Sequence, residues 1–362
     1  MDNKNKIIAI QNISEKYKNF DLPYYVFKKI EENGFQRTSS PMKIGFKITN
    51  QCLFRCEYCF THKDEKNISI ETIKKTIKDL DQIPFEVYLT GGDPLLHPEI
   101  YKIIDLFYDW NILLKLHTTG ITSKENIEYL KKNIHKIEGI QISIDSISKF
   151  EKLRKSKIKD PLNRIEEFVD GIGVKEKVIV NTVVSNYNYN ELKEIIDYCE
   201  KIGINKIRLS PIFCKDTNLY KLDNELIDIF YEAAIYCDKK HIQLIDTPFS
   251  HPWSLRLLEN IESNRLFCPA YKTEIEIDVD GNVYPCPFLH DEFHELGNIY
   301  KNDINDIWNN GPKLMLEVSK WSKNSECLNC RNYSKCGGGC YANAFINNKD
   351  YDVRCILHDE NK

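Results

Sequence analysis

Two kinds of hydrophobic spacing alternate along the chain between residues 43 and 240. Short apolar or alternating runs, typical of β-strands, cover 43–49, 85–90, 112–118, 139–145, 177–185 and 206–211. Stretches with helical spacing separate them, near 69–80, 98–109, 123–133, 161–170 and 188–202. Repeated strand–helix units predict a parallel sheet. Six of them predict an α/β fold, a partial (β/α)6 TIM-like barrel with its functional residues at the C-terminal ends of the strands.

The pattern changes on both sides of this region. Residues 1–40 are polar with one short helical pattern, and a further helix is expected at 222–240. From about 265 the chain has short strands, glycine turns and many cysteines, including a hairpin around Asp280-Gly281. We therefore predict an N-terminal extension (1–40), a barrel (41–240), a connecting segment (241–264) and a small cysteine-rich domain (265–362).

Charge and cysteine content narrow the class of protein. The 50 Lys and Arg residues against 54 Asp and Glu give a net charge of −4, which argues against nucleic-acid binding. No apolar run is long enough to span a membrane, and the N-terminus lacks the apolar segment of a signal peptide. We therefore expect a cytoplasmic protein that does not bind membranes. Thirteen cysteines in such a protein indicate metal or redox chemistry rather than disulfides.

The first three cysteines follow the first predicted strand, in the segment "CLFRCEYCF". A structural zinc site needs four ligands and disulfides need pairs, so Cys52, Cys56 and Cys59 fit neither directly. Three thiolates can instead hold three irons of a 4Fe–4S cube and leave the fourth iron for an exogenous ligand. The alternative is a zinc site completed by a distant residue such as His62.

Further motifs stand at successive strand ends. "TGGDP" follows the second strand, "SID" ends the fourth strand, and "KLRKS" comes shortly after it. Together with the CxxxCxxC segment, this order of motifs resembles the radical SAM superfamily.

The resemblance assigns a role in binding S-adenosylmethionine (SAM) to each motif. Tyr58 would pack on the adenine, and the backbone at Gly91, Gly92 and Asp93 would contact the methionyl amino group. The ribose would contact Ser143 and Asp145, and the SAM carboxylate would meet Arg154.

The C-terminal cysteines follow the pattern C-x2-C-x5-C-x3-C between residues 327 and 340, with others before and after. This pattern resembles the SPASM extension of radical SAM enzymes, which binds two further 4Fe–4S clusters. The resemblance assigns the distal cluster to Cys327, Cys330, Cys336 and Cys355. It assigns the inner cluster to Cys268, Cys286 and Cys340, one ligand short. An oxygen ligand could complete the inner cube, since Glu274 stands where some relatives have a cysteine, or one iron is open. The alternative for the whole region is a pair of zinc ribbons.

Three cysteines lie outside these groups. Cys199 and Cys237 fall on apolar helical stripes and are predicted to be core residues. Cys214 follows the sixth strand, where the barrel mouth is expected, and could donate a hydrogen atom to a substrate radical. Packing in a loop is the simpler interpretation of Cys214.

The resemblance implies an enzyme that cleaves SAM reductively to a 5′-deoxyadenosyl radical and abstracts hydrogen from a substrate C–H bond. It implies three 4Fe–4S clusters and a one-electron reductant such as flavodoxin or ferredoxin. The substrate predicted first is a peptide or protein side chain, which would be crosslinked, oxidised or epimerised. Against this, residues 1–40 are too short for the leader-binding domain of many peptide maturases. A small metabolite is the alternative, and a non-catalytic iron–sulfur redox protein is the third hypothesis.

Overall fold

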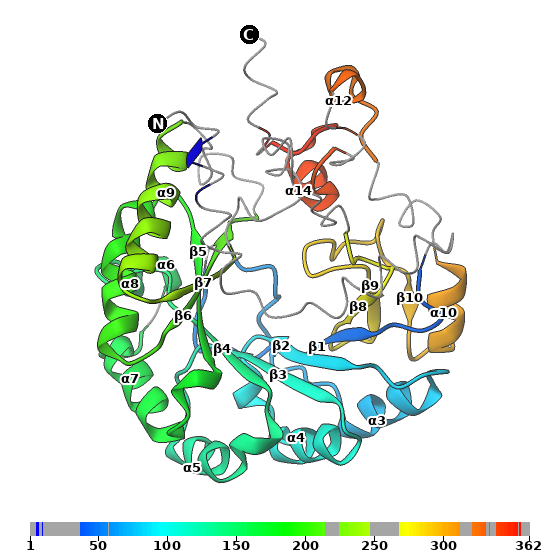
Figure 1. Ribbon diagram of the computed structural model, residues 1–362. Helices are drawn as coiled ribbons and strands as arrows, with labels where there is room; N and C mark the ends of the chain where they lie inside the picture. The colour runs from blue at the N-terminus through cyan, green and yellow to red at the C-terminus, as the bar shows by residue number, and fades with distance from the viewer. Residues whose placement is uncertain are drawn as a thin grey trace.

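The computed structural model describes residues 5–6, 9, 37–56, 58–155, 157–213, 224–246, 268–311, 321–330, 333, 338–353 and 355. One ten-stranded sheet has the order β10-β9-β8-β1-β2-β3-β4-β5-β6-β7. All pairs from β8 through β1 to β7 are parallel, and the β8–β9 and β9–β10 pairs are antiparallel. The sheet curves so that helices line its outer side and the strands line the inside (Figure 1). The predicted partial barrel is confirmed.

The elements have the following bounds. The strands are β1 (Lys43–Thr49), β2 (Glu86–Gly91), β3 (Leu113–Thr118), β4 (Gly139–Ser143), β5 (Val178–Val184), β6 (Lys206–Pro211), β7 (Gln243–Asp246), β8 (Glu274–Ile277), β9 (Asn282–Tyr284) and β10 (Gly297–Asn298). The α-helices are α3 (Ile70–Asp79), α4 (Ile100–Asp109), α5 (Lys124–Asn133), α6 (Phe150–Arg154), α7 (Pro161–Ile172), α8 (Leu192–Lys201), α9 (Asn224–Lys239), α10 (Ile304–Asn310), α12 (Ser325–Asn329) and α14 (Tyr341–Ile346). Short 3-10 turns are η1 (Pro94–Leu96), η2 (Ile134–Lys136), η3 (Lys175–Lys177) and η4 (Tyr189–Glu191).

The outer helices begin at capping residues and bury one apolar stripe each. Ser69 caps α3 by accepting a hydrogen bond from the amide of Thr72 at 3.1 Å, and Ser123 caps α5 in the same way through the amide of Asn126. The stripes pack against alternate strand residues, as Phe107 of α4 does against Phe46 of β1. Cys199 and Cys237 are fully buried in this core, as predicted.

The other strand residues form a polar inner face. Lys43 of β1 lies 3.4 Å from Glu86 of β2 and 3.6 Å from Glu274 of β8, and Lys115 of β3 lies 2.5 Å from Glu86. His117 stacks on Tyr88, and burial together with nearby Arg208 and Lys43 lowers its pKa to about 3. Closed (β/α)8 barrels fill this space with branched apolar residues. Here the wall presents hydrogen-bonding and charged groups instead. These inner-face residues are Lys43, Lys47, Glu86, Tyr88, Lys115, His117, Gln141, Asn181, Arg208, Ser210, Glu274 and Glu276.

The cysteine-rich region continues the barrel sheet. β8 pairs in parallel with β1, from Lys43↔Glu274 to Phe46↔Ile277, and its hairpin with β9 surrounds the predicted turn at Gly281. Backbone hydrogen bonds from Met42 and Lys43 to the carbonyl of Thr273 extend this connection.

The structure adds β7 to the predicted elements. It lies in the predicted connecting segment, and its four residues are too few for a periodic signal. Residues 247–267, Cys214, Cys336 and most of the predicted N-terminal extension lie outside the described residues. None of the described helices has the length and apolar character needed to cross a bilayer.

Candidate functional site

The loop with Cys52, Cys56 and Cys59 follows β1 at the C-terminal edge of the sheet. Burial raises the pKa of Cys52 and Cys56, and the three thiols affect one another electrostatically. Burial also opposes ionisation of Cys59, but Lys63 and hydrogen bonds with Thr61 outweigh it and lower its pKa. Three closely placed, partly desolvated thiols can all ionise only when a cationic centre compensates their charge. The donor set therefore fits a metal cluster.

The zinc alternative for this loop involves His62. Its side chain is 84% exposed and lies 3.9 Å from Asp64. Among the described residues, no three His, Cys, Asp or Glu side chains are grouped closely enough to bind a single metal ion.

Gly91 and Gly92 lie directly against the cysteine loop. The amide of Gly92 donates to the carbonyl of Thr49 at 2.6 Å, and the amide of Asp93 donates to the carbonyl of Gln51 at 2.7 Å. A Cβ atom on Gly92 would lie 1.9 Å from the Gln51 carbonyl oxygen. Glycine is therefore required for this backbone to approach the loop.

Asp93 serves the structure of the same edge. Its buried carboxylate accepts a hydrogen bond from the hydroxyl of Thr118 and another from the hydroxyl of Thr119. It also accepts hydrogen bonds from the amides of Thr119 and Leu95. It therefore ties the end of β2 to the end of β3 and leaves its own backbone next to the cysteine loop. This geometry is compatible with the predicted main-chain role of the Gly-Gly-Asp segment.

Tyr58, within the cysteine loop, comes together with Asp145 and Arg154. One carboxylate oxygen of Asp145 accepts hydrogen bonds from the Tyr58 hydroxyl and from Arg154, the latter at 2.5 Å, and the other accepts the amide of Val183. Arg154 also lies over the rings of Phe54 and Phe150. In this arrangement Asp145 is buried, whereas Ser143 at the end of β4 is partly exposed.

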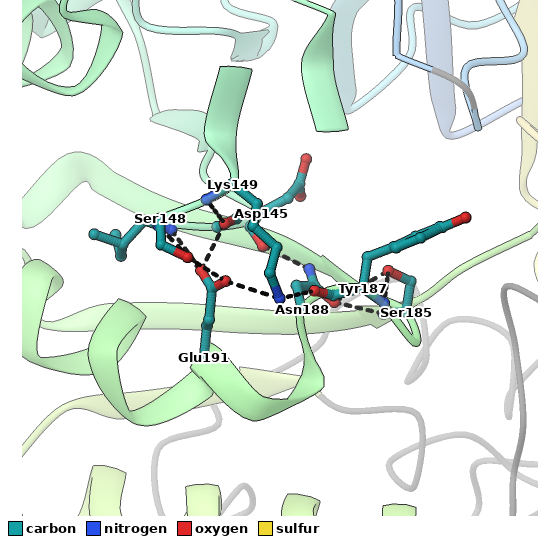
Figure 2. Close-up of polar contacts among 9 residues, drawn as sticks. Asp145, Ser148, Lys149, Ser185, Tyr187, Asn188 and Glu191 are labelled. Atoms are coloured by element: carbon teal, nitrogen blue, oxygen red, sulfur yellow. Dashed lines mark hydrogen bonds and ion pairs between the residues drawn. The ribbon is translucent and has the colours of Figure 1, made fainter. Parts of the chain in front are cut away.

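A second carboxylate holds the loop that carries Asp145. Glu191 accepts hydrogen bonds from the hydroxyls of Ser146 and Ser148 and from the amides of Ile147 and Ser148. Asn188 donates to the carbonyl of Asp145 (Figure 2). Burial opposes ionisation of Glu191, but these hydrogen bonds outweigh it and lower its pKa to about 2. Glu191 is thus an ionised anchor for the end of β4.

The structure brings Cys268, Cys286 and Cys340 together. Burial, and after it the charge of Cys340, raise the pKa of Cys268 to about 12. Burial and the charges of Cys268 and Cys340 raise the pKa of Cys286. These residues lie 18 to 72 positions apart in the sequence, so the fold assembles a second set of three thiols that fits a metal cluster.

Three of the four cysteines predicted for the distal cluster are described. Cys327 and Cys330 flank the end of α12, where the amide of Cys330 donates to the carbonyl of Cys327 at 3.0 Å. Buried Asp352 links the distal and inner sets. Its carboxylate accepts the amide of Cys340 at 2.8 Å, and its carbonyl accepts the amide of Cys355 at 2.9 Å.

Two bridges join the first cysteine loop to the inner set. Phe60 contacts Phe288, and Phe288 stacks on Phe213 with centroids 3.8 Å apart. The second bridge begins at Lys47, which interacts electrostatically with Cys59. The ammonium of Lys47 lies 3.1 Å from a ring nitrogen of His290. His290 in turn lies 2.7 Å from Glu276, whose charge acts on Cys286.

Sequence reasoning missed the residues of this second bridge. Tyr88 also belongs to this bridge, since its hydroxyl donates to Glu276 at 2.7 Å. The four residues, Lys47, Tyr88, Glu276 and His290, come from separate segments, and no motif joins them. The signal that could have found three of them is the placement of polar residues at alternate positions of otherwise apolar strands.

Comparison with protein families agrees with this geometry. Residues 46–199 match the model of the radical SAM superfamily, and residues 268–331 match that of the SPASM iron–sulfur cluster-binding domain. This chain is a radical SAM enzyme with a C-terminal SPASM domain. The family assignment supports SAM binding by the first domain and 4Fe–4S clusters in both, so the zinc interpretations are set aside.

Individual relatives of the radical SAM/SPASM chain are distant. It is 21% identical to mycofactocin maturase MftC of Mycobacterium ulcerans over 341 residues, covering 85% of each chain. It is 26% identical to GTP 3′,8-cyclase of Helicobacter pylori over 282 residues, covering 72% of this chain and 84% of the relative. Its fold matches that of Streptococcus suis SuiB bound to the precursor peptide SuiA, with a TM-score of 0.68 and 20% identity, covering 94% of this chain and 82% of the other.

Proposed function

We propose that this radical SAM/SPASM enzyme modifies a side chain of a peptide or protein, by crosslinking, oxidation or epimerisation. Bound SAM and its cluster would supply a 5′-deoxyadenosyl radical that removes a hydrogen atom, and two auxiliary clusters would accept an electron from the substrate. Peptide-directed relatives, the maturase MftC and SuiB with its precursor peptide, support this substrate class.

The observation that carries the proposal is the placement of two thiol sets on one sheet, with a bridge of aromatic and polar side chains between them. Phe60 is the residue directly after Cys59, and Phe288 lies two residues after Cys286. The rings of Phe60 and Phe288 contact each other. A substrate at the barrel mouth would therefore lie between the radical source and an electron acceptor. This position suits a reaction in which the substrate loses a hydrogen atom, an electron and a proton.

The residues of the loop and strand ends would hold the cofactors. We propose Cys52, Cys56 and Cys59 as ligands of the SAM cluster. SAM would be positioned by contacts with Tyr58, Gly91, Gly92, Asp93, Ser143, Asp145 and Arg154. For Asp145 to reach the ribose, the Tyr58 hydroxyl must release it. The inner cluster would use Cys268, Cys286 and Cys340, and the distal one Cys327, Cys330, Cys336 and Cys355.

The first test needs no substrate. Anaerobically reconstituted protein should hold roughly 12 irons per chain, as three 4Fe–4S cubes require. It should also release 5′-deoxyadenosine from SAM on reduction, by dithionite or by flavodoxin or ferredoxin. Changing Cys52, Cys56 and Cys59 together to Ala should remove about a third of the iron and abolish SAM cleavage. Iron without SAM cleavage would favour a non-catalytic redox protein.

The second test concerns the substrate. Short peptides encoded beside this gene should lose two hydrogens, or exchange one with solvent, when incubated with the reduced enzyme and SAM, as seen by mass spectrometry. Uptake of one solvent deuterium that Cys214→Ala abolishes would assign Cys214 as a hydrogen donor in an epimerisation.

A small metabolite is the competing substrate class. The similarity to GTP 3′,8-cyclase and the charged inner face of the strands favour it. Turnover of a metabolite pool, with no change in any neighbouring peptide, would replace the peptide proposal with this one.

A further inference from the structure

The inner thiol set supplies three ligands, whereas a 4Fe–4S cube has four irons. Several other side chains among the described residues near this set could bind iron through oxygen or nitrogen. Glu274 and Glu276 stand on β8, and a bridge between Ala270 and Glu274 places the first of them beside the segment of Cys268. Asp352 is fully buried, and its carboxylate already accepts the amide of Cys340 at 2.8 Å. His290 lies 2.7 Å from Glu276.

Glu276 and His290 already form hydrogen bonds with other side chains. One oxygen of Glu276 accepts the Tyr88 hydroxyl at 2.7 Å, and the other meets His290. The second ring nitrogen of His290 lies 3.1 Å from the ammonium of Lys47. Burial opposes the ionisation of Glu276, but His290 and Lys47 outweigh it and lower its pKa to about 2. Its side chain is 1% exposed. Ligation by either residue would break a satisfied, buried array.

Glu274 differs in each respect. Its side chain keeps 16% of its surface exposed, and it forms a long ion pair of 3.6 Å with Lys43. Lys43 has a second carboxylate partner, Glu86, at 3.4 Å, so it stays paired when Glu274 turns away.

The backbone holds Glu274 close to the thiols. The carbonyl of Pro269, which follows Cys268, accepts the amides of Lys272, Thr273 and Glu274 at 3.0 to 3.2 Å. The amide of Tyr271 donates to the carbonyl of Glu274 at 2.9 Å. This compact turn returns the chain beside Cys268 before β8 begins.

We infer that Glu274 is the fourth ligand of the inner auxiliary cluster, which is then held by three thiolates and one carboxylate. The inference rests on the cluster assignment of the proposed function but not on its peptide substrate. Carboxylate is a harder and less strongly donating ligand for iron than thiolate.

The experiment uses the full chain, reconstituted anaerobically, with Cys52, Cys56 and Cys59 changed to Ala so that only the auxiliary clusters contribute. Three variants are compared with this parent: Glu274→Ala, Glu274→Cys and, as a matched control, Glu86→Gln, which alters the other partner of Lys43. Iron content and the electron paramagnetic resonance of the reduced protein are recorded with and without 2-mercaptoethanol.

We expect the spectrum to change in Glu274→Ala and to shift further when 2-mercaptoethanol occupies the opened iron. Glu274→Cys should give a spectrum that 2-mercaptoethanol does not alter and a more negative reduction potential. Glu86→Gln should match the parent. Glu274→Ala could instead lose the whole cluster, which would lower the iron content by about four per chain. Recovery of these irons in Glu274→Cys would then also support ligation by residue 274.

The inference is overturned if Glu274→Ala has the parent's spectrum, or if 2-mercaptoethanol shifts parent and Glu274→Ala equally, since the iron is then open or bound by another group. A parent without auxiliary iron would overturn it together with the cluster assignment. Failure to find a modified peptide would leave it unaffected.

Discussion

The ring of Phe60 meets the ring of Phe288 edge to face, with their centroids 5.9 Å apart. Each ring stands next to one of the two thiol sets that the fold brings together, and Phe213 at the end of β6 stacks on the second ring. The contact therefore joins the segments that carry the two sets, and we propose that it forms part of the wall that a substrate would meet.

Phe288→Ala should weaken this wall. Loss of a partly buried aromatic contact should lower the free energy of unfolding by about 2 kcal/mol, less than for a fully buried ring. The enzyme should also make more 5′-deoxyadenosine per molecule of product, because the substrate is positioned less firmly and solvent is excluded less well. Urea unfolding and product ratios measure the two effects. Phe293→Ala, whose side chain is 65% exposed in the same domain, should change neither.

Gly92→Ala should disrupt the SAM cluster. The new Cβ would collide with the Gln51 carbonyl, so the cysteine loop must move away from β2. We expect loss of about a third of the iron and of SAM binding. Gly173→Ala is the control, because Gly173 has φ +75° but no atom within 4 Å of the added Cβ. It should cost about 1 kcal/mol of stability and keep all the iron. Normal SAM cleavage by Gly92→Ala would contradict the role of this contact.

Glu191→Gln should lower stability in a pH-dependent manner. The pKa of Glu191 is depressed to about 2, so its contribution is present above the unfolded-state value, about 4.3, and is lost as pH falls toward 2. The shift corresponds to at most about 3 kcal/mol at neutral pH. Urea unfolding of the apoprotein at pH 7 should separate wild type from Glu191→Gln. The difference should shrink as the pH falls below about 4 and nearly vanish only near pH 2. A constant difference would rule out the ionised anchor.

Asp352→Ala should release iron from the inner auxiliary cluster. The change removes the carboxylate that accepts the amide of Cys340, whereas the backbone carbonyl that accepts the amide of Cys355 stays. We expect a loss of about a third of the roughly 12 irons. Asp352→Asn should retain them, because its amide oxygen can accept the same hydrogen bond. Asp350→Ala removes a nearby surface contact with Asn324 and should have no effect. An iron content equal to that of the wild type in Asp352→Ala would show that this carboxylate does not hold Cys340 in place.

Local patterns were sufficient for most of the barrel. The prediction of β1 and β6 matches the structure residue for residue, because apolar runs between polar turns mark their ends. The start of α3 was also accessible, since Ser69 is a capping residue before a periodic stripe. β7 was missed because Gln243–Asp246, with four residues, is too short to show a period of its own.

The site was predictable where chemistry is concentrated in short motifs and not where it depends on distant pairing. Three cysteines within eight residues point to a cluster from the sequence alone. The pairing of Glu276 with His290, and the sharing of Lys43 between Glu86 and Glu274, depend on the register of β8 against β1. No local sequence pattern specifies that register.

The parallel pairing of β8 with β1 also has a consequence for dividing the chain. If the gene were truncated before residue 268, β1 would become an edge strand with its amides and carbonyls exposed. Such an edge can recruit strands from other copies. An isolated barrel should therefore aggregate on expression even though its own strands, β1 to β7, are all present.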